Sequence, residues 1–294
     1  MGSGSWSDAS FRSYSMNLGR TVDTYGAVTG SYSNQEIFRS TRLDPMLDPK
    51  GVVRECCDSE EHPNVVPVIL ALDVTGSMGQ AAVEVAKKLN VVMTELYKDV
   101  ADVQIMAMGI GDMAYDNTPC QATQFESDIR IADQMEKIYF EFGGGGNGFE
   151  SYTLPWYFAL NHTKIDAINK RGKKGIIITM GDEPLNPYLP VKGWQASFES
   201  VFGDRPEKDI DTKELYNKVK DKFECYHIHV EEGSYEFDKV KDRFIKVMGE
   251  DRVICANLDN IAQRIVNIVK ANANLDAEPV FNTGLKKENG EITW

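Results

Sequence analysis

The strongest constraint on this chain is a series of short, almost wholly apolar runs separated by helical patterns, which begins at residue 65. Residues 65–73 read Val-Val-Pro-Val-Ile-Leu-Ala-Leu-Asp, and residues 174–179 read Lys-Gly-Ile-Ile-Ile-Thr. Runs of this kind are typical of strands buried on both faces of a parallel sheet. Between them, residues 80–98 carry apolar side chains at helical spacing. This alternation predicts an α/β fold, a doubly wound, Rossmann-like and mostly parallel sheet with helices on both faces.

The pattern divides the chain into three parts. Residues 65–270 form the predicted domain, with further strands at 103–109, 122–125, 224–230 and 252–256 and further helices at 129–140, 151–161, 212–223, 235–248 and 258–270. Residues 1–64 keep neither period, so we expect an extended N-terminal arm whose aromatic residues lie on the domain or on a partner, with a short helix at 34–41. Residues 271–294 are polar and form a predicted C-terminal tail.

Charge and cysteine content narrow the classes of partner and compartment. The 294 residues hold 32 Lys and Arg against 45 Asp and Glu, a net charge of −13. Nucleic acid and anionic membranes would repel such a chain, so neither is an expected partner. No apolar run approaches the ~20 residues that cross a bilayer, and the first residues lack the features of a secretion signal. The five cysteines are odd in number and include no C-x-x-C pair, which favours reduced thiols and a cytoplasmic location.

Three loops carry oxygen donors. Two of them directly follow predicted strands, and the other is a glycine-rich segment. The first is Asp73-Val-Thr75-Gly-Ser77, the second is the Gly-rich segment 143–150, and the third is Gly181-Asp182-Glu183-Pro184. Ligands of doubly wound sheets bind at the carboxyl ends of the strands, where such loops meet. Carboxylates and hydroxyls together form an all-oxygen set, which hard divalent cations such as Mg²⁺ prefer.

These motifs resemble those of a known family. Asp73-x-Thr75-x-Ser77 resembles the Asp-x-Ser-x-Ser signature of von Willebrand factor type A (VWA) domains, whose metal-ion-dependent adhesion site (MIDAS) adds donors from two further loops. Gly-Gly-Gly-Asn147-Gly-Phe-Glu and Gly-Asp182-x-Pro resemble the Gly-Gly-Gly-Asp-x-Pro-Glu and Gly-Asp-x-Pro motifs of some intracellular VWA proteins, including those joined to alpha-kinases. The resemblance covers residues 65–270.

The resemblance implies a metal site made of Asp73, Thr75, Ser77, Asn147 and Asp182. Thr75 keeps the hydroxyl of the family's Ser. Asn147 replaces an Asp and removes one negative charge, so Glu150 and Thr153 are alternative ligands from the second loop.

The family also implies a function. A MIDAS holds Mg²⁺, or Mn²⁺ or Ca²⁺, with one position open to an Asp or Glu of a partner protein, because the ion's charge inverts the local electrostatics. The expected protein is therefore a non-enzymatic binding module. VWA proteins of this general kind often work beside MoxR-type AAA+ ATPases, which makes such an ATPase an expected partner class.

Two other functions remain open at this point. One is a structural or assembly protein whose metal site is vestigial. The other is a Mg²⁺-dependent hydrolase or phosphatase, which is disfavoured because no His stands near the loop motifs in sequence to form a nucleophile–base pair with Ser77. An aspartyl-phosphate enzyme of the haloacid dehalogenase type would need an acid at position 75, where the chain has Thr.

Weaker signals are interpreted as structural. Gly109-Ile-Gly-Asp112-Met-Ala matches a dinucleotide fingerprint, but Pro119 soon after breaks the helix that such a site needs. The Gly run at 143–148 lacks the Lys of a phosphate-binding P-loop. Asp112 is read as a solvated residue or an outer-sphere acid near the ion. His227 and His229 alternate on one predicted strand, where packing is favoured over a metal pair.

Overall fold

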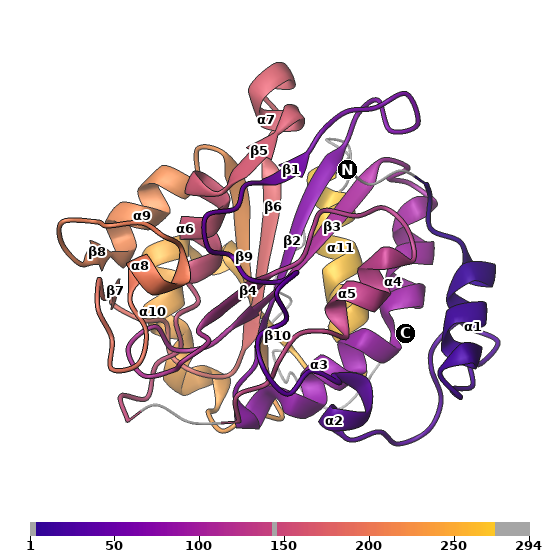
Figure 1. Cartoon of the computed structure of the whole chain (residues 1–294), viewed down its shortest axis with the longest axis horizontal. Helices are drawn as coiled ribbons and strands as arrows, with labels where there is room; N and C mark the ends of the chain where they lie inside the picture. Colours follow the sequence, from indigo (N-terminus) through magenta and orange to yellow (C-terminus); the bar gives the residue numbers. More distant parts are fainter. Residues whose placement is uncertain (1–3, 143–145, 274–294) are drawn as a thin grey trace, which may run out of the picture.

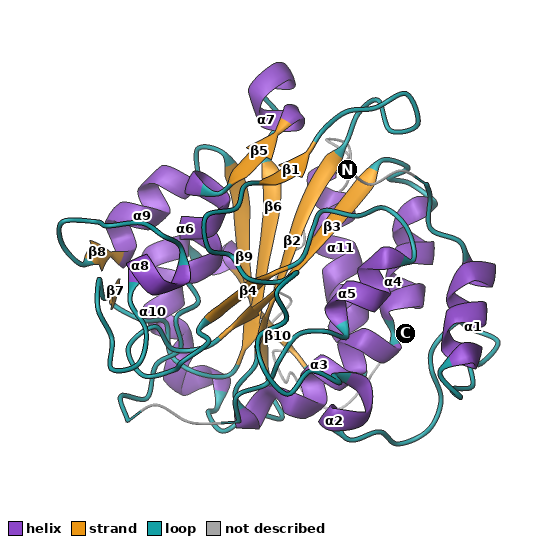
Figure 2. Cartoon of the chain, in the orientation of Figure 1, coloured by secondary structure: helices purple, strands orange, loops and turns teal. Residues whose placement is uncertain are grey.

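The protein is a mixed α/β structure built on one central sheet between two layers of helices (Figure 1). The computed structural model describes residues 4–142 and 146–273. Figure 2 shows the sheet edge-on between the two groups of helices. The predicted α/β class, with a mostly parallel sheet and helices on both faces, is confirmed.

The central sheet has six strands in the order β10-β9-β6-β2-β3-β4. Five of them are parallel, and β4 runs antiparallel beside β3 at one edge. Counted along the chain from β2, the order from β4 across to β10 is 3-2-1-4-5-6, which is that of doubly wound sheets. The strands are β2 (Val66–Asp73), β3 (Val103–Ile110), β4 (Cys120–Ala122), β6 (Gly175–Gly181), β9 (Phe223–Val230) and β10 (Val253–Ala256).

Each face of the sheet has its own hydrophobic core, because successive strand residues point to opposite faces. Leu70 and Ile178 point to the face covered by one helical layer, whereas Ile69 and Ile177 point to the other. The first layer contains α3 (Gly79–Lys87), α4 (Leu89–Tyr97), α5 (Arg130–Met135) and α11 (Ile261–Ala273). The second contains α6 (Leu154–Asn161), α8 (Phe198–Val201), α9 (Thr212–Val219) and α10 (Phe237–Met248).

The N-terminal arm is packed on the domain and contains regular structure. The helix α1 (Asp8–Asn17) begins at Ser7, whose side chain caps it, and Trp6 beside it donates a hydrogen bond to Asn90 of α4 at 2.8 Å. The arm also contains α2 (Asn34–Ile37) and β1 (Arg54–Cys56), which pairs in parallel with β5 (Thr163–Ile165). The expectation of an extended arm was therefore wrong in its conformation, since a capped helix and a paired strand lie within it.

Several predicted elements have different bounds. The helix expected at 80–98 is divided at Lys88, whose Nζ donates to the carbonyl of Leu258 at 2.7 Å. The helix expected at 129–140 ends at Met135, and β4 ends at Ala122, where a strand was expected to begin. The α11 helix extends to Ala273, into the predicted tail, and residues 274–294 lie outside the described residues.

Short elements complete the chain. The 3-10 turns η1 (Gly76–Met78) and η2 (Glu250–Arg252) precede α3 and β10, α7 (Asp166–Arg171) follows β5, and β7 (Tyr188–Leu189) pairs with β8 (Ile210–Asp211). Within residues 4–142 and 146–273, no helix has the length and apolar character needed to cross a membrane.

Candidate metal centre

The loops that carry Asp73 and Asp182 meet where the strand order reverses. Asp73 is the last residue of β2, and Asp182 directly follows β6, its neighbour in the sheet. The chain leaves β2 toward β3 on one side and reaches β6 on the other, so β2 and β6 flank the switch point. This is the position at which doubly wound sheets hold their ligands.

Asp73 is fully buried and is fixed by three hydrogen bonds. The backbone N–H and the hydroxyl of Thr75 donate to its Oδ1 at 2.9 and 2.6 Å, and the hydroxyl of Tyr152 donates to its Oδ2 at 2.8 Å. A hydroxyl that gives its proton to a carboxylate keeps its lone pairs for another partner. The Thr75 oxygen can therefore still act as a metal ligand.

Asp182 is also held by hydrogen bonds, which come from the loop after β2 and the loop after β9. The hydroxyl of Ser77 donates to Asp182 Oδ1 at 2.9 Å, and the backbone N–H of Ser234 donates to Oδ2. Asp182 is also fully buried, and Ser77 is half-buried. The structure thus brings together Asp73 with Thr75 and Ser77 with Asp182, four of the five residues predicted as ligands.

Tyr152 connects the two loops and was missed from the sequence. Its hydroxyl donates to Asp73 and accepts a hydrogen bond from the backbone N–H of Glu183 at 3.1 Å. Its ring packs against His227 at 4.9 Å between centroids and against Phe244 of α10 at 5.7 Å. A hydroxyl that comes from a third segment of the chain therefore fixes the relative position of the β2 and β6 loops.

Two glycines make this close packing possible. A Cβ on Gly181 would lie 2.0 Å from the hydroxyl of Tyr152, and a Cβ on Gly233 would lie 2.1 Å from the Cβ of Asp182. Neither space can hold a side chain, so glycine is required at both positions by its small size. Gly181 thus lets Tyr152 reach Asp73.

Asn147, the fifth predicted ligand, makes its hydrogen bonds with residues outside the Asp73 and Asp182 loops. Its Nδ2 donates to Asp112 Oδ2 at 2.8 Å, and its Oδ1 accepts from the backbone N–H of Phe149 at 3.2 Å. Both polar atoms of the amide are therefore engaged within the second loop and with Asp112, which Ser151 also contacts through its hydroxyl at 3.3 Å. Residues 143–145 of the Gly-rich segment lie outside the described residues.

The two alternative ligands from the second loop also differ from each other. Thr153 is buried and accepts a hydrogen bond from Asn186 at 2.7 Å. Glu150 is only 2% exposed, and its Oε2 has no hydrogen-bond partner among the described residues. A buried, unpartnered carboxylate oxygen is costly unless it is protonated or faces a cation.

Burial and mutual repulsion keep these acids from ionising easily. Burial raises the pKa of Asp73 from 3.8 to about 7, and the charge of Asp182 adds to this, while the bonds from Thr75 and Tyr152 oppose it. Burial also raises the pKa of Glu183 to about 7 and that of Asp116 to about 6, and it raises the pKa of Glu150 well above its usual range. A bound cation would relieve this repulsion.

One histidine lies closer to these loops than its position in the sequence suggested. The register of β6 and β9 places His229 opposite Gly181, and the charge of Asp182 acts on its ring. Both His227 and His229 are fully buried, and Nε2 of His227 has no hydrogen-bond partner among the described residues. Nδ1 of His227 lies 3.0 Å from the hydroxyl of Thr179.

The donor set fits a cation held largely by hydroxyls and water rather than by side-chain acids alone. Over residues 4–142 and 146–273, no group of three or more His, Cys, Asp or Glu side chains is close enough to surround an ion. Two carboxylates and two hydroxyls remain, which suits a hard divalent ion that keeps several waters.

The segment 109–114, which matches a dinucleotide fingerprint in sequence, ends in a turn rather than a helix. After β3 the chain turns at Asp112–Asp116 and returns as the antiparallel β4, so no helix follows Gly111. A Cβ on Gly111 would lie 2.3 Å from a carboxylate oxygen of Asp116, which accounts for this glycine by packing.

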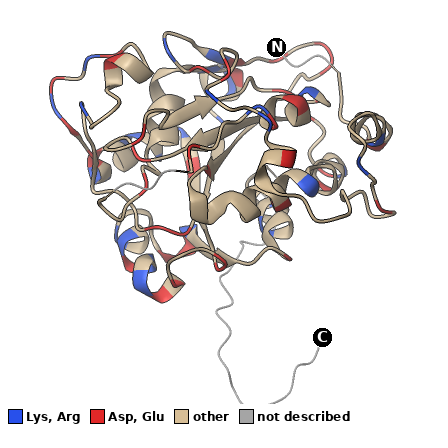
Figure 3. Cartoon of the chain, turned by 60° about the horizontal axis from the view of Figure 1, so that its bottom comes forward, with Lys and Arg blue, Asp and Glu red and all other residues tan. Residues whose placement is uncertain are grey.

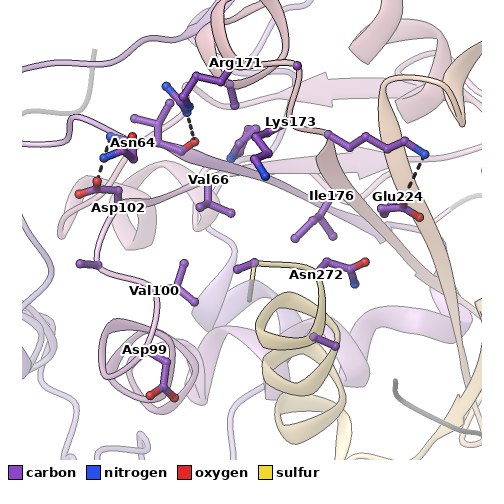
Figure 4. Close-up of a pocket in the computed structure, with 18 residues that line it drawn as sticks. Asn64, Val66, Asp99, Val100, Asp102, Arg171, Lys173, Ile176, Glu224 and Asn272 are labelled. Atoms are coloured by element: carbon purple, nitrogen blue, oxygen red, sulfur yellow. Dashed lines mark hydrogen bonds and ion pairs between the residues drawn. The ribbon is translucent and has the colours of Figure 1, made fainter. Parts of the chain in front are cut away.

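A cavity lies at the opposite edge of the sheet, the amino edge, where the strands begin. Its volume is about 910 Å³, and it lies between the starts of β2 and β6 and the end of α11 (Figure 4). Two of its acids have partners: Glu224 forms ion pairs with Lys174 at 3.0 Å and Arg252 at 2.6 Å, and Asp102 accepts a hydrogen bond from the backbone N–H of Asn64 at 3.0 Å. This cavity is separate from the candidate centre.

Comparisons with known proteins do not assign the chain to a family. No family model and no curated protein match the chain. Among solved structures, it is similar to the pilus adhesin SpaC from Lactobacillus rhamnosus GG, with 14% identity over 76% of this chain and 32% of the adhesin, at a TM-score of 0.47. It is also similar to proximal thread matrix protein 1 from the mussel byssus, with 12% identity over 71% of this chain and 46% of that one, at a TM-score of 0.43. The chain thus spans about a third of the adhesin and under half of the matrix protein.

Proposed function

We propose that this protein is a VWA-type binding module, in which a divalent cation at the switch point coordinates an Asp or Glu of a partner protein. The observation that carries the proposal is the hydrogen bond between Ser77 and Asp182 beside the buried pair of Asp73 and Thr75. This bond joins the β2 loop to the β6 loop, and the two loops together carry two carboxylates and two hydroxyls. Mg²⁺ is the preferred ion for such a set, with Mn²⁺ and Ca²⁺ as alternatives.

The charges of the site favour binding over catalysis. Asp73 and Asp182 would balance a divalent ion while the hydroxyls of Thr75 and Ser77 add no charge. When bound, the ion supplies a positive centre that can accept a carboxylate from outside. The chain's own residues orient the donors: Thr75 and Tyr152 fix Asp73, and Ser77 and Ser234 fix Asp182.

A pull-down with and without chelator tests this function. The full chain is used as bait in magnesium and in EDTA, beside the variant Asp182→Ala and the control Asp99→Ala, whose carboxylate lines the cavity at the opposite edge of the sheet. We expect partners that bind in magnesium to be lost in EDTA and with Asp182→Ala, and retained with Asp99→Ala. A MoxR-type AAA+ ATPase is the partner class to look for first.

Two results would redirect the proposal. The same partners bound equally in EDTA would favour an assembly protein with a vestigial metal site. Turnover of a phosphoester substrate that is lost with Asp182→Ala would favour a Mg²⁺-dependent hydrolase.

A further inference from the structure

Three exposed aromatic side chains lie on the loops at the carboxyl edge of the sheet. Trp194 is 85% exposed, Phe142 46% and Tyr115 38%. Large aromatic side chains contribute strongly to protein–protein binding, and exposed ones are informative when structure holds them in place. We call these three residues the aromatic rim.

The backbone at Trp194 is held by hydrogen bonds, although its side chain is exposed to solvent. Its backbone N–H donates to the carbonyl of Ala114 at 2.6 Å, and the N–H of Gly193 donates to Ala196 at 2.8 Å. A Cβ on Gly193 would lie 2.1 Å from the carbonyl oxygen of Met113, so only glycine allows this approach. The turn that presents Trp194 is therefore pinned to the loop that carries Asp112.

Tyr115 lies between that turn and the Gly-rich loop. The side chain of Gln195 donates to the carbonyl of Tyr115 at 3.0 Å, and the Tyr115 ring lies 3.8 Å from the position of a Cβ on Gly146. The rim thus continues from Trp194 toward the second loop of the candidate metal centre.

Phe142, the third residue of the rim, lies beside the loop after β2 that carries Thr75 and Ser77. Its carbonyl oxygen lies 3.8 Å from the position of a Cβ on Gly76, between Thr75 and Ser77. Glu141 before it accepts backbone hydrogen bonds from Asn117 and Thr118, which joins this segment to the Tyr115 loop. Phe142 has a φ of 48°, a strained backbone for a bulky residue of the kind that gathers at binding sites.

The negative charge at the carboxyl edge of the sheet favours a partner with basic side chains next to the aromatic rim. Glu183 is half-buried, and its carboxylate has no hydrogen bond or ion pair to the described residues. Figure 3 turns this edge toward the viewer, with acidic residues in red. The faces of aromatic rings attract cations, and unpaired carboxylates add to that attraction.

We propose that the rim receives Lys or Arg side chains that flank the metal-bound acid of the partner. This inference rests on the proposed function and specifies its partner: a protein segment with one acidic residue between basic neighbours. The acid binds the ion, and the basic side chains contact the rim and Glu183. An apolar flank would gain the ring contacts but would leave Glu183 without a partner.

A display selection tests the sequence of the partner segment directly. Short random peptides with one fixed central Asp are bound to the full chain in magnesium and eluted with EDTA. We expect the eluted peptides to be enriched in Lys and Arg next to the Asp. Apolar or acidic neighbours would overturn the inference and leave the proposed function standing, whereas no EDTA-eluted peptide at all would overturn both.

An enriched peptide, made synthetically, then tests the rim itself. Trp194→Ala should weaken its binding in magnesium by about threefold to tenfold, as expected for loss of a cation–π contact. Trp194→Phe should restore most of that loss. The matched control is Tyr25→Ala, which removes an 87% exposed aromatic of the N-terminal arm and should leave binding unchanged. Equal effects of Trp194→Ala and Tyr25→Ala would contradict the proposal.

Discussion

Acidic residues have opposite electrostatic environments at the two ends of the parallel strands, the amino edge where the strands begin and the carboxyl edge where they end. At the amino edge, burial opposes ionisation of Glu224, but Lys174 and Arg252 hold its pKa below the usual value. At the carboxyl edge, where the strands end, burial raises the pKa of Asp73 to about 7, and the main groups of the described structure that act on it are Thr75, Asp182 and Tyr152. Glu224 at the first edge is thus paired with basic side chains of this chain. Asp73 at the second edge would be stabilised by a proton or a cation, and this difference distinguishes the candidate site.

The largest expected effect of this contrast is on the pH dependence of stability without metal. A carboxyl whose pKa is raised by folding contributes stability that is fully present below its unfolded pKa, here 3.8, and is lost as pH rises through its folded pKa, here about 7. We therefore expect the free energy of unfolding in EDTA to fall between pH 4 and pH 7, by at most about 1.4 kcal/mol per pH unit for each proton involved.

Urea unfolding across this pH range measures the effect. Asp73→Asn removes one of the titrating groups and should flatten the slope, whereas Glu224→Gln at the amino edge should not. A stability that rises steadily from pH 4 to pH 7 in the wild type would contradict the assignment.

Metal binding should reverse the effect at the carboxyl edge. A ligand that binds only the folded state at 100 times its dissociation constant stabilises by about 2.7 kcal/mol. Saturating Mg²⁺ should raise the melting temperature of the wild type at pH 8, and Asp73→Ala should abolish the rise. Asp99→Ala, at the opposite edge, serves as the control and should keep it. An equal rise in both variants would place the ion elsewhere.

Removing one acid from each edge should have opposite consequences in EDTA. Glu150→Gln replaces a buried carboxylate that has no partner for Oε2 and should stabilise the chain, whereas Glu224→Gln weakens two ion pairs and should destabilise it. The two variants should differ by about 2 kcal/mol. Chemical denaturation of both at pH 7 measures the difference, and destabilisation of equal size would remove the distinction between the edges.

The smallest expected effect comes from the hydroxyl that joins the two loops. Tyr152→Phe keeps the ring packing but removes the hydrogen bonds to Asp73 and to the Glu183 backbone, at a cost of about 1 kcal/mol. Calorimetric titration with Mg²⁺ should also show weaker binding, because Asp73 loses one of the groups that orient it. Tyr157→Phe, which removes the bond to Asp204, is the matched control and should leave Mg²⁺ binding unchanged.

Sequence reasoning reached furthest where structure depends on neighbouring residues. Continuous apolar runs end at Asp73 and near Asp182, and the geometry of parallel strands alone places such ends at one edge. The α/β class and the grouping of the Asp73 and Asp182 loops followed from this. The helix α1 was missed because Phe11 and Ser15 are its only buried residues, so little apolar pattern marks it and its packing on α4 depends on contacts distant in sequence.

The same limit applies to the second loop. Asn147 bonds to Asp112, which follows another strand, and nothing local in the Gly-rich segment encodes that choice. Tyr152 reaches Asp73 only because Gly181 leaves room for its hydroxyl, a fit between residues on two different loops. Asn147 and Tyr152, whose positions depend on contacts between loops, therefore escaped prediction, whereas the buried strands that end at Asp73 and next to Asp182 did not.

An anomalous difference map from crystals grown in manganese would test the central claim most directly. The account predicts a single strong peak within coordination distance of Ser77 Oγ and close to the carboxylates of Asp73 and Asp182, with no peak in the amino-edge cavity. No peak between the β2 and β6 loops at saturating manganese, or a peak only among the paired acids at the amino edge, would contradict it.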